Sequence, residues 1–88
     1  MRRSKMQIYI STLEALVYNG PLRITRITYK ANVSCSLLKP ILEYLIQNEF
    51  VEERALKENK VFYVATPKAR KVLSYFNKVK EMLPIPED

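Results

Sequence analysis

The middle of the chain constrains the fold more than any other part, because it places two short helices and a hairpin in close succession. Ile24, Ile27 and Ala31 recur at steps of three and four, as apolar residues do on one face of a helix. Thr25 is the expected N-cap of this helix, which ends near Ala31. Asn32 follows, and asparagine tolerates the backbone of a tight turn. A short helix ending in a tight turn is therefore predicted here.

A second helix comes directly after the turn. Val33 is expected to anchor the turn in the core, and Ser34 or Ser36 to cap a helix that runs to about Asn48. Pro40 lies in the opening turns of this helix, where the missing N–H is expected to distort the first turn or delay the helix start. The inward set of the helix is Leu38, Ile41, Leu42, Leu45 and Ile46. Two short helices joined by a tight turn form a helix-turn-helix.

A β-hairpin is predicted immediately after the second helix. Residues 50–54 and 61–65 read as strands, the second of them rich in β-branched and aromatic side chains. Residues 56–60 are the expected loop. Both faces of the second strand are apolar, since Val61, Tyr63 and Ala65 alternate with two other apolar residues. Each face of the hairpin is therefore expected to be covered.

One helix precedes this unit and another follows it. The first is expected over 4–19, with Ser4 as its cap, Gly20 in the left-handed position just past its end and Pro21 unable to continue it. Residues 22–24 are short and extended, as in an edge strand. Thr66-Pro67 supplies a cap and a proline at the first helical position, so a last helix is expected over 67–83.

The predicted fold is therefore α+β and mostly helical. It is a winged helix-turn-helix with a three-helix core, a β-hairpin wing and a C-terminal dimerisation helix. A chain of 88 residues leaves room for one domain. We expect the core and wing in 4–66, the C-terminal helix in 67–83 and a frayed tail in 84–88.

Composition excludes several classes of function. The chain has no histidine and a single cysteine, so the common zinc, haem and iron–sulfur ligand sets are absent, as are Ser–His and Cys–His catalysis. We therefore expect no metal, no cofactor and no enzymatic activity. No apolar run approaches the roughly 20 residues that span a bilayer, so no membrane partner is expected and the location is predicted to be cytoplasmic and DNA-associated.

Charge favours a polyanionic partner. Lysine and arginine total 15 against 9 acidic residues, giving a net charge of +6, and the sequence pI is about 9.6. A basic balance of this kind on a helix-turn-helix indicates nucleic-acid binding.

The stretch from Thr25 to Ser34 carries a family likeness. It resembles the small crenarchaeal winged-helix DNA-binding proteins and predicted transcription regulators, whose pattern is T-R-I-x-Y-x-A-N, an apolar residue and S. All eight constrained positions match here, namely Thr25, Arg26, Ile27, Tyr29, Ala31, Asn32, Val33 and Ser34. The likeness extends more loosely from Lys5 to about Asn77.

This resemblance implies binding of double-stranded DNA by a homodimer, usually one formed through the C-terminal helix. It also implies a source in archaea, or in an archaeal virus or plasmid, and a role in transcription regulation. Two features depart from the family pattern. Pro40 replaces an ordinary helix residue, and the last helix is shorter than the long coiled-coil helix of the nucleoid-type members.

The predicted DNA contacts fall into three groups. The second helix of the motif, at about 34–48, enters the major groove with its N-terminal turns, and the wing, at about 54–61, lies on the backbone or in the minor groove. The helix contributes Ser34, Cys35, Ser36, Lys39 and Pro40. The preceding segment contributes Arg23, Arg26, Tyr29 and Lys30 for phosphate contacts, and the wing contributes Arg54, Lys57, Asn59 and Lys60.

Structural alternatives stay open for most of these residues. The serines serve equally well as caps alone. Arg26 is also placed to pair with Glu52 or Glu53, and Tyr29 to pack in the core. The lysines of the wing also suit an ordinary solvated hairpin.

The last helix carries a candidate dimer seam. Val72, Phe76, Val79 and Leu83 are spaced four, three and four, as at the a and d positions of a coiled coil. The alternative is a monomer whose last helix packs only on its own core. The leading functional hypothesis is a homodimeric transcription regulator. The alternatives are an architectural, largely non-specific DNA-binding protein and a winged helix used as a protein–protein interaction module.

Overall fold

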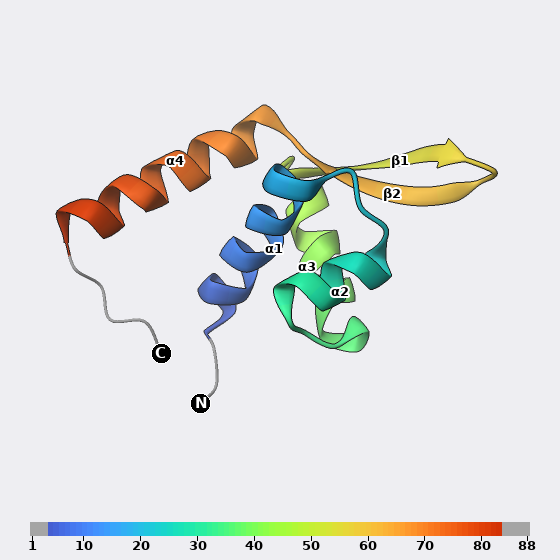
Figure 1. Cartoon of the computed structure of the whole chain (residues 1–88), viewed down its shortest axis with the longest axis horizontal. Coiled ribbons are helices and arrows are strands. Elements are labelled where there is room, and N and C mark those ends of the chain that lie inside the picture. The colour runs from blue at the N-terminus through green and yellow to red at the C-terminus, as the bar shows by residue number, and fades with distance from the viewer. Residues whose placement is uncertain (1–3, 84–88) are drawn as a thin grey trace.

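The computed structural model describes residues 4–83, except the side chain of Leu56, and they form four helices and a two-stranded antiparallel sheet (Figure 1). The predicted fold class, mostly helical α+β with a hairpin wing, is confirmed. In chain order the elements are α1 (Lys5–Asn19), α2 (Ile24–Ala31), α3 (Cys35–Gln47), β1 (Val51–Lys57), β2 (Lys60–Ala65) and α4 (Pro67–Met82). The expected tail, 84–88, lies outside the described residues.

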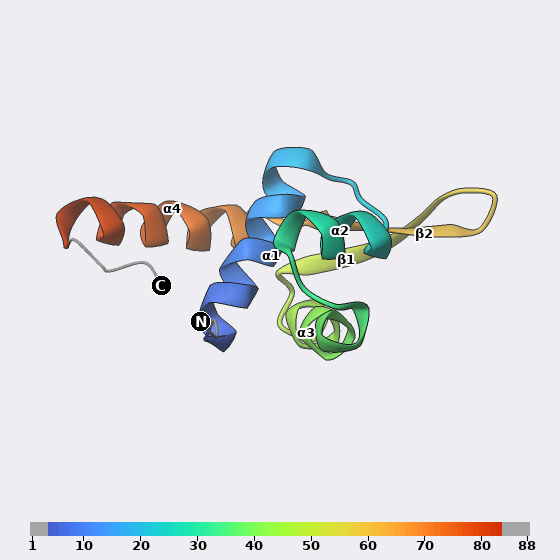
Figure 2. The same cartoon turned by 60° about the horizontal axis from the view of Figure 1, so that its bottom comes forward.

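The core lies where α1, α2 and α3 meet beneath the base of the hairpin. Ile27 of α2 and Leu38 of α3 are both 0% exposed, and Val51 at the start of β1 is 1% exposed. Ala69 and Leu73 of α4 join the same cluster. The remaining members of the core are Ile8, Ile10, Leu13, Ala15, Leu16, Leu22, Ile41, Leu42, Leu45 and Ala65. Figure 2 shows α3 end-on beneath α2 and β1.

Side-chain caps fix the starts of three helices as predicted. Ser4 accepts a hydrogen bond from the backbone N–H of Gln7, whose side chain accepts one from the backbone N–H of Ser4, so α1 begins with a reciprocal capping box. Ser34, rather than Ser36, caps α3 by accepting from Leu37 N–H at 3.3 Å. Thr66 caps α4 by accepting from Ala69 N–H at 3.3 Å.

Two predictions about the segment between α1 and α2 are wrong. Gly20 is extended, with φ −69° and ψ 164°, because the residue before a proline is held away from helical backbone. Glycine suits the site for a different reason, since an added Cβ would overlap the carbonyl oxygen of Leu16. Thr25 does not cap α2. The helix begins at Ile24 after an extended Arg23 that makes no side-chain capping bond.

The hairpin is tighter than predicted. Glu58 and Asn59 both have positive φ, 44° and 62°, so a two-residue turn replaces the expected five-residue loop, and the strands extend to Lys57 and Lys60. Primed two-residue turns of this kind match the right-handed twist of paired strands. The strands pair from Val51 opposite Ala65 to Lys57 opposite Lys60, with a register irregularity between Ala55 and Lys57.

The predicted edge strand at 22–24 is present as a single bridge. The N–H of Leu22 donates to the carbonyl of Tyr63 at 3.1 Å, and the N–H of Tyr63 donates to the carbonyl of Leu22 at 2.8 Å. This bridge joins the approach to α2 to the middle of β2. The wing is therefore attached directly to the helix-turn-helix.

The last helix leaves the body in the direction opposite to the wing (Figure 1). Ala69 and Leu73, in its first half, are buried, whereas Tyr75, Val79 and Met82 are exposed. The chain thus has a compact centre with the wing and the end of α4 projecting along its longest extent, which is 45 Å.

Thr66 joins three elements and supplies a test of the fold. Its hydroxyl donates to the carbonyl of Glu49 at 2.7 Å and accepts from the N–H of Ala69 at 3.3 Å. Thr66→Val keeps the shape of the side chain but loses both bonds, and we expect unfolding in urea to show a loss of about 1–3 kcal/mol. The same change at Thr25, an exposed position of α2, should cost less than about 0.5 kcal/mol. Equal effects at the two positions would contradict this role of Thr66.

Candidate nucleic-acid interface

A left-handed residue makes the turn between α2 and α3. Asn32 has φ 57° and ψ 52°, and its N–H donates to the carbonyl of Thr28. The N–H of Val33 donates to the same carbonyl at 3.1 Å, and its side chain packs against the core. Asparagine is among the few residues that adopt this backbone readily. The predicted turn and its anchor are therefore confirmed.

The start of α3 is open to solvent. Ser34, Cys35, Ser36, Lys39 and Pro40 are all exposed, although the next residues along the inner side of the helix are fully buried. The hydroxyls of Ser34 and Ser36 lie 3.3 Å apart. The outer face of the first two turns of α3 can thus be approached by a ligand without displacing any other element.

Pro40 does not delay the start of α3, so the predicted late start is wrong. The helix runs without a break from Cys35 to Gln47 with the proline inside it. A proline at this position removes the hydrogen bond to the carbonyl four residues earlier, that of Ser36. Both residues are exposed, so water can satisfy that carbonyl.

Leu37 is an exposed residue of this face that the sequence reasoning did not select. It is 47% exposed, whereas Leu38 beside it is 0% exposed. An apolar side chain at the start of a recognition helix suits the methyl group of thymine. The sequence did contain a signal for the exposure of Leu37. Leu38, Ile41 and Leu45 are spaced as the inward face of the helix, and Leu37 does not fall on that face.

The residues selected on and before α2 are also exposed, namely Arg23, Arg26, Tyr29 and Lys30. Tyr29 is 78% exposed, so the alternative in which it packs in the core is wrong. Arg26 forms no ion pair with Glu52 or Glu53, because the ion pair found among residues 4–83 joins Arg54 to Glu52 at 2.9 Å. Arg54 is therefore partly compensated, whereas Arg26 is available to an anion.

The wing tip concentrates positive charge. Lys57 and Lys60 are directly opposite one another across the hairpin, and both are exposed, as is Asn59 between them. Like charges in opposed positions destabilise a strand pair by a few tenths of a kcal/mol to about 1 kcal/mol. Glu58 at the turn offsets only part of this charge. An anion held between the two lysines would relieve their repulsion.

Tyr63 lies in β2 of the wing, opposite Glu53 of β1. Burial raises the pKa of its hydroxyl above the ordinary 10.0, and the nearby Glu53 and Cys35 raise it further. Separately, α3 packs against β1, and the N–H of Phe50 donates to the carbonyl of Leu45 at 2.8 Å, so the last turn of α3 leads directly into the base of the wing. The two predicted DNA-contacting elements therefore adjoin one another.

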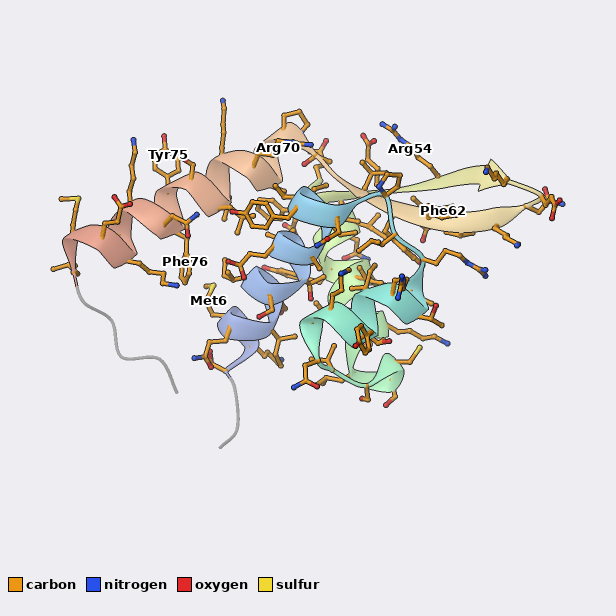
Figure 3. The ribbon with its side chains drawn as sticks, in the orientation of Figure 1. Met6, Arg54, Phe62, Arg70, Tyr75 and Phe76 are labelled. Carbon is orange, nitrogen blue, oxygen red and sulfur yellow. The ribbon has the colours of Figure 1, made fainter. Side chains whose placement is uncertain are left out.

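Three residues of the predicted dimer seam lie on α4 and the fourth, Leu83, is its extended C-cap, and the seam becomes more exposed toward the helix end. Val72 and Phe76 are half-buried, Val79 is 44% exposed and Leu83 is 63% exposed. Phe76 lies on the side of α4 that faces Met6 of α1 (Figure 3). Within residues 4–83 there is no cluster of three metal-ligating side chains, and none of the helices there is long and apolar enough to cross a membrane.

Comparison with known proteins also indicates a winged helix-turn-helix. The family model for the winged helix-turn-helix matches residues 2–84. A search of the curated proteins found no match.

Solved structures share the fold. The reduced form of the transcriptional regulator YodB from B. subtilis is 28% identical, with a TM-score of 0.74 over 97% of this chain and 86% of that chain. Sso10a-2, a DNA-binding protein from Sulfolobus solfataricus, is 24% identical, with a TM-score of 0.72 over 92% and 85%. A protein of unknown function from Listeria innocua is 19% identical, with a TM-score of 0.76 over 85% of this chain, which spans about half (52%) of that one. The fold is thus that of DNA-binding transcription regulators.

The helix containing Pro40 gives a test of local stability. Pro40→Ala restores the N–H that can donate to the Ser36 carbonyl, and alanine is about 3 kcal/mol better than proline inside a helix. Because proline also restricts the unfolded chain, we expect a net gain of about 1–2 kcal/mol in urea unfolding. Glu43→Ala, at an exposed site one turn later, should change stability by less than about 0.5 kcal/mol. A loss of stability in Pro40→Ala would contradict this account of α3.

Proposed function

Because the chain belongs to the winged helix-turn-helix family, we propose that it is a double-stranded DNA-binding transcription regulator that acts as a homodimer. In this proposal α3 enters the major groove with its exposed first turns, and the wing follows the adjacent backbone or minor groove. The thirteen predicted contact residues are proposed to divide between these two elements and α2. No catalytic role is proposed for any of them.

The wing tip is the observation that carries this proposal. Lys57 and Lys60 are held opposite each other at the end of the hairpin, where their repulsion opposes strand pairing. A phosphate between them converts that cost into a favourable interaction. The first turns of α3 are exposed on a helix that packs against β1 of the wing, so both can meet one duplex.

The α2 residues complete the proposed contact. Arg26, Tyr29 and Lys30 are exposed on the helix that crosses the backbone in proteins of this motif. Phosphate contacts of this kind strengthen binding to any sequence, whereas base contacts on α3 select among sequences.

A second function of the same class is favoured by the small number of base-reading side chains. Lys39 is the single basic residue on the exposed first turns of α3, and Ser36 and Leu37 offer shorter contacts. An architectural, largely non-specific DNA-binding protein needs no more than this. A crenarchaeal source, or one in an archaeal virus or plasmid, is proposed with the similarity to a DNA-binding protein from Sulfolobus in its support, and a DNA-associated place in the cytoplasm is proposed from the DNA binding itself.

The homodimer is proposed to form along α4. Val79 and Leu83 present exposed apolar surface on the same side as the half-buried Phe76. Pairing of two such helices buries that surface and places two recognition helices in two-fold relation. Half-sites one helical turn apart are then expected in the target DNA.

DNA binding is tested with the wing lysines. Lys57→Gln with Lys60→Gln removes two proposed phosphate contacts, so we expect weaker binding to a duplex and a slope of log K against log salt that is shallower by about 1.8. Fluorescence anisotropy with a random duplex and with the protein's own upstream DNA, at several salt concentrations, measures both. Tighter binding to the upstream DNA identifies a specific regulator, and equal affinities identify the architectural protein.

The control for this test keeps the charge. Lys57→Arg with Lys60→Arg should bind with nearly the wild-type salt slope, and neither pair of changes should lower thermal stability, since the Gln pair relieves repulsion. Wild-type protein that binds neither duplex at low salt would overturn both DNA functions and favour a protein–protein interaction module.

The dimer is tested by placing charge in the seam. Val79→Glu with Leu83→Glu should convert the dimer to a monomer in sedimentation equilibrium, because burying two carboxylates costs more than the seam contributes. Ser74→Lys, on the opposite side of α4, should leave the mass unchanged. A wild-type mass of one chain at all concentrations would contradict the proposed dimer.

A further inference from the structure

The charges of α4 are not explained by the fold or by the proposed DNA contacts. Lys68, Arg70 and Lys71 lie in the first turns of α4, where the helix dipole disfavours positive charge, and no acidic residue lies in its first turn. Lys78 and Lys80 follow, so five cations stand against Glu81 alone within Pro67–Met82. A helix that serves only as a dimer seam has no need of this excess.

Lys68 has a structural role. Its Nζ donates to the carbonyl of Asn48 at 2.9 Å and lies 4.6 Å from the centre of the Phe50 ring. Asn48 is the C-cap of α3, where a cation is favourable to the helix dipole. Lys80 lies over the Phe76 ring at 5.5 Å. These two lysines are therefore occupied within the fold.

Three cations remain: Arg70, which is next to Lys71 in sequence and so lies off its stripe of the helix, and Lys71 and Lys78, which have Tyr75 between them. The spacings of four and three place Lys71, Tyr75 and Lys78 on one stripe of the helix, and all three are exposed, Tyr75 by 68%. Neither lysine has an acidic partner within 4.0 Å among residues 4–83, where the ion pair found is that of Arg54 with Glu52. We call this stripe, Lys71, Tyr75 and Lys78, the outer face of α4.

The outer face lies on the side of α4 opposite its buried face, and Tyr75 borders the seam, because Val72 and Val79 are three and four residues from it. Ala69 and Leu73 are buried against the domain, and Phe76 points toward the side of Met6. Tyr75 points the other way, away from α1 (Figure 3). Lys71 and Lys78 of the outer face therefore stay exposed whether α4 packs on its own core or pairs with a second copy.

The position of the outer face excludes contact with a duplex held by the helix-turn-helix. The α2–α3 turn lies at the opposite edge of the molecule from Tyr75, and α4 extends away from the wing (Figure 1). A duplex lying across α3 and the wing would leave the outer face turned outward. Any polyanion bound there would be a different molecule or a distant part of the same one.

The spacing of the two lysines suits a DNA backbone. Seven residues of helix separate their Cα atoms by roughly 10 Å, and the two flexible lysine side chains can adjust from there to separate phosphates of one strand. Tyr75 adds a phenolic O–H donor between them. Basic side chains with an interleaved aromatic residue are typical of nucleic-acid surfaces.

We propose that the outer face of α4, formed by Lys71, Tyr75 and Lys78, is a second binding surface for the phosphate backbone of double-stranded DNA. This inference rests on the proposed function, in which the helix-turn-helix and wing hold the first duplex. A chain with both surfaces bridges two duplexes, or two segments of one, independently of the sequence at the second.

A bead assay tests the second surface. A biotinylated duplex is fixed to beads, protein is added, and capture of a free dye-labelled duplex is measured. Lys71→Gln with Lys78→Gln removes two phosphate contacts, whose combined salt-dependent contribution at 0.15 M salt is about thirtyfold in affinity. We expect this variant to lose capture of the second duplex while its affinity for a single duplex, measured by anisotropy, falls less than about threefold.

Two further variants separate the surfaces. Lys71→Arg with Lys78→Arg keeps the charge and should bridge like the wild type. Lys57→Gln with Lys60→Gln should weaken single-duplex binding itself. Capture by the Lys71→Gln, Lys78→Gln variant at the wild-type level would overturn the proposal, because two helix-turn-helix units of a dimer would then do the bridging. Wild-type protein that binds a single duplex but captures no second one would also overturn it, and would leave the outer face to an acidic protein. Absence of any duplex binding by the wild type would instead show that the proposed function fails.

Discussion

The packing of α2 against α3 is the interaction on which the rest of the structure depends. Ile27 and Leu38 are both 0% exposed, and they lie on either side of a turn of three residues. With Val33 packed beneath it, that turn has one orientation. Burial of two such side chains contributes several kcal/mol, at about 1.5–3 kcal/mol each. Because the inner side of α3 is fixed in this way, its outer side, with Ser36 and Lys39, is presented at a defined angle.

Contacts with the same core fix the position of the wing. Val51, at the base of β1, is 1% exposed. Two residues earlier, the carbonyl of Glu49 accepts a hydrogen bond from the hydroxyl of Thr66, which directly follows β2. Leu22 pairs with Tyr63 and so ties the hairpin to the approach of α2. The hairpin is thereby held at its base while its tip, with the opposed Lys57 and Lys60, projects into solvent.

Most of the fold could be predicted from local sequence, because the signals were local. The caps of Ser4 and Thr66, the left-handed Asn32 and the inward leucines of α3 each act within a few residues. The error at Gly20 arose because two local signals competed, and Pro21, which holds the residue before it extended, overrides the left-handed backbone expected just past a helix. Gly20 is needed for its close approach to Leu16 rather than for a left-handed backbone.

The exposed set could also be predicted, but the pairing of its charges could not. The residues selected on α2, α3 and the wing are all exposed, since apolar periodicity identifies the complementary face. Which cations are compensated depends on strand register and on contacts between distant segments. Glu52 pairs with Arg54 rather than Arg26, and Lys68 binds the end of α3, twenty residues away. The two-residue turn, which places Lys57 opposite Lys60, requires a positive φ at Glu58. Glutamate does not favour that backbone conformation, so the turn could not be predicted from the residue type.

The distribution of compensated and uncompensated charge separates structural cations from those available to a ligand. Lys68 is stabilised by its hydrogen bond to the carbonyl at the end of α3, and Arg54 is stabilised by its ion pair with Glu52, two residues away in β1. Lys57 and Lys60 are placed where they repel each other, and Lys71 lies where the helix dipole opposes it. A fold selected for stability alone would place acids or neutral residues at these three positions. Positive charge retained at a local cost, on surfaces that no other element covers, is what a protein that binds polyanions requires.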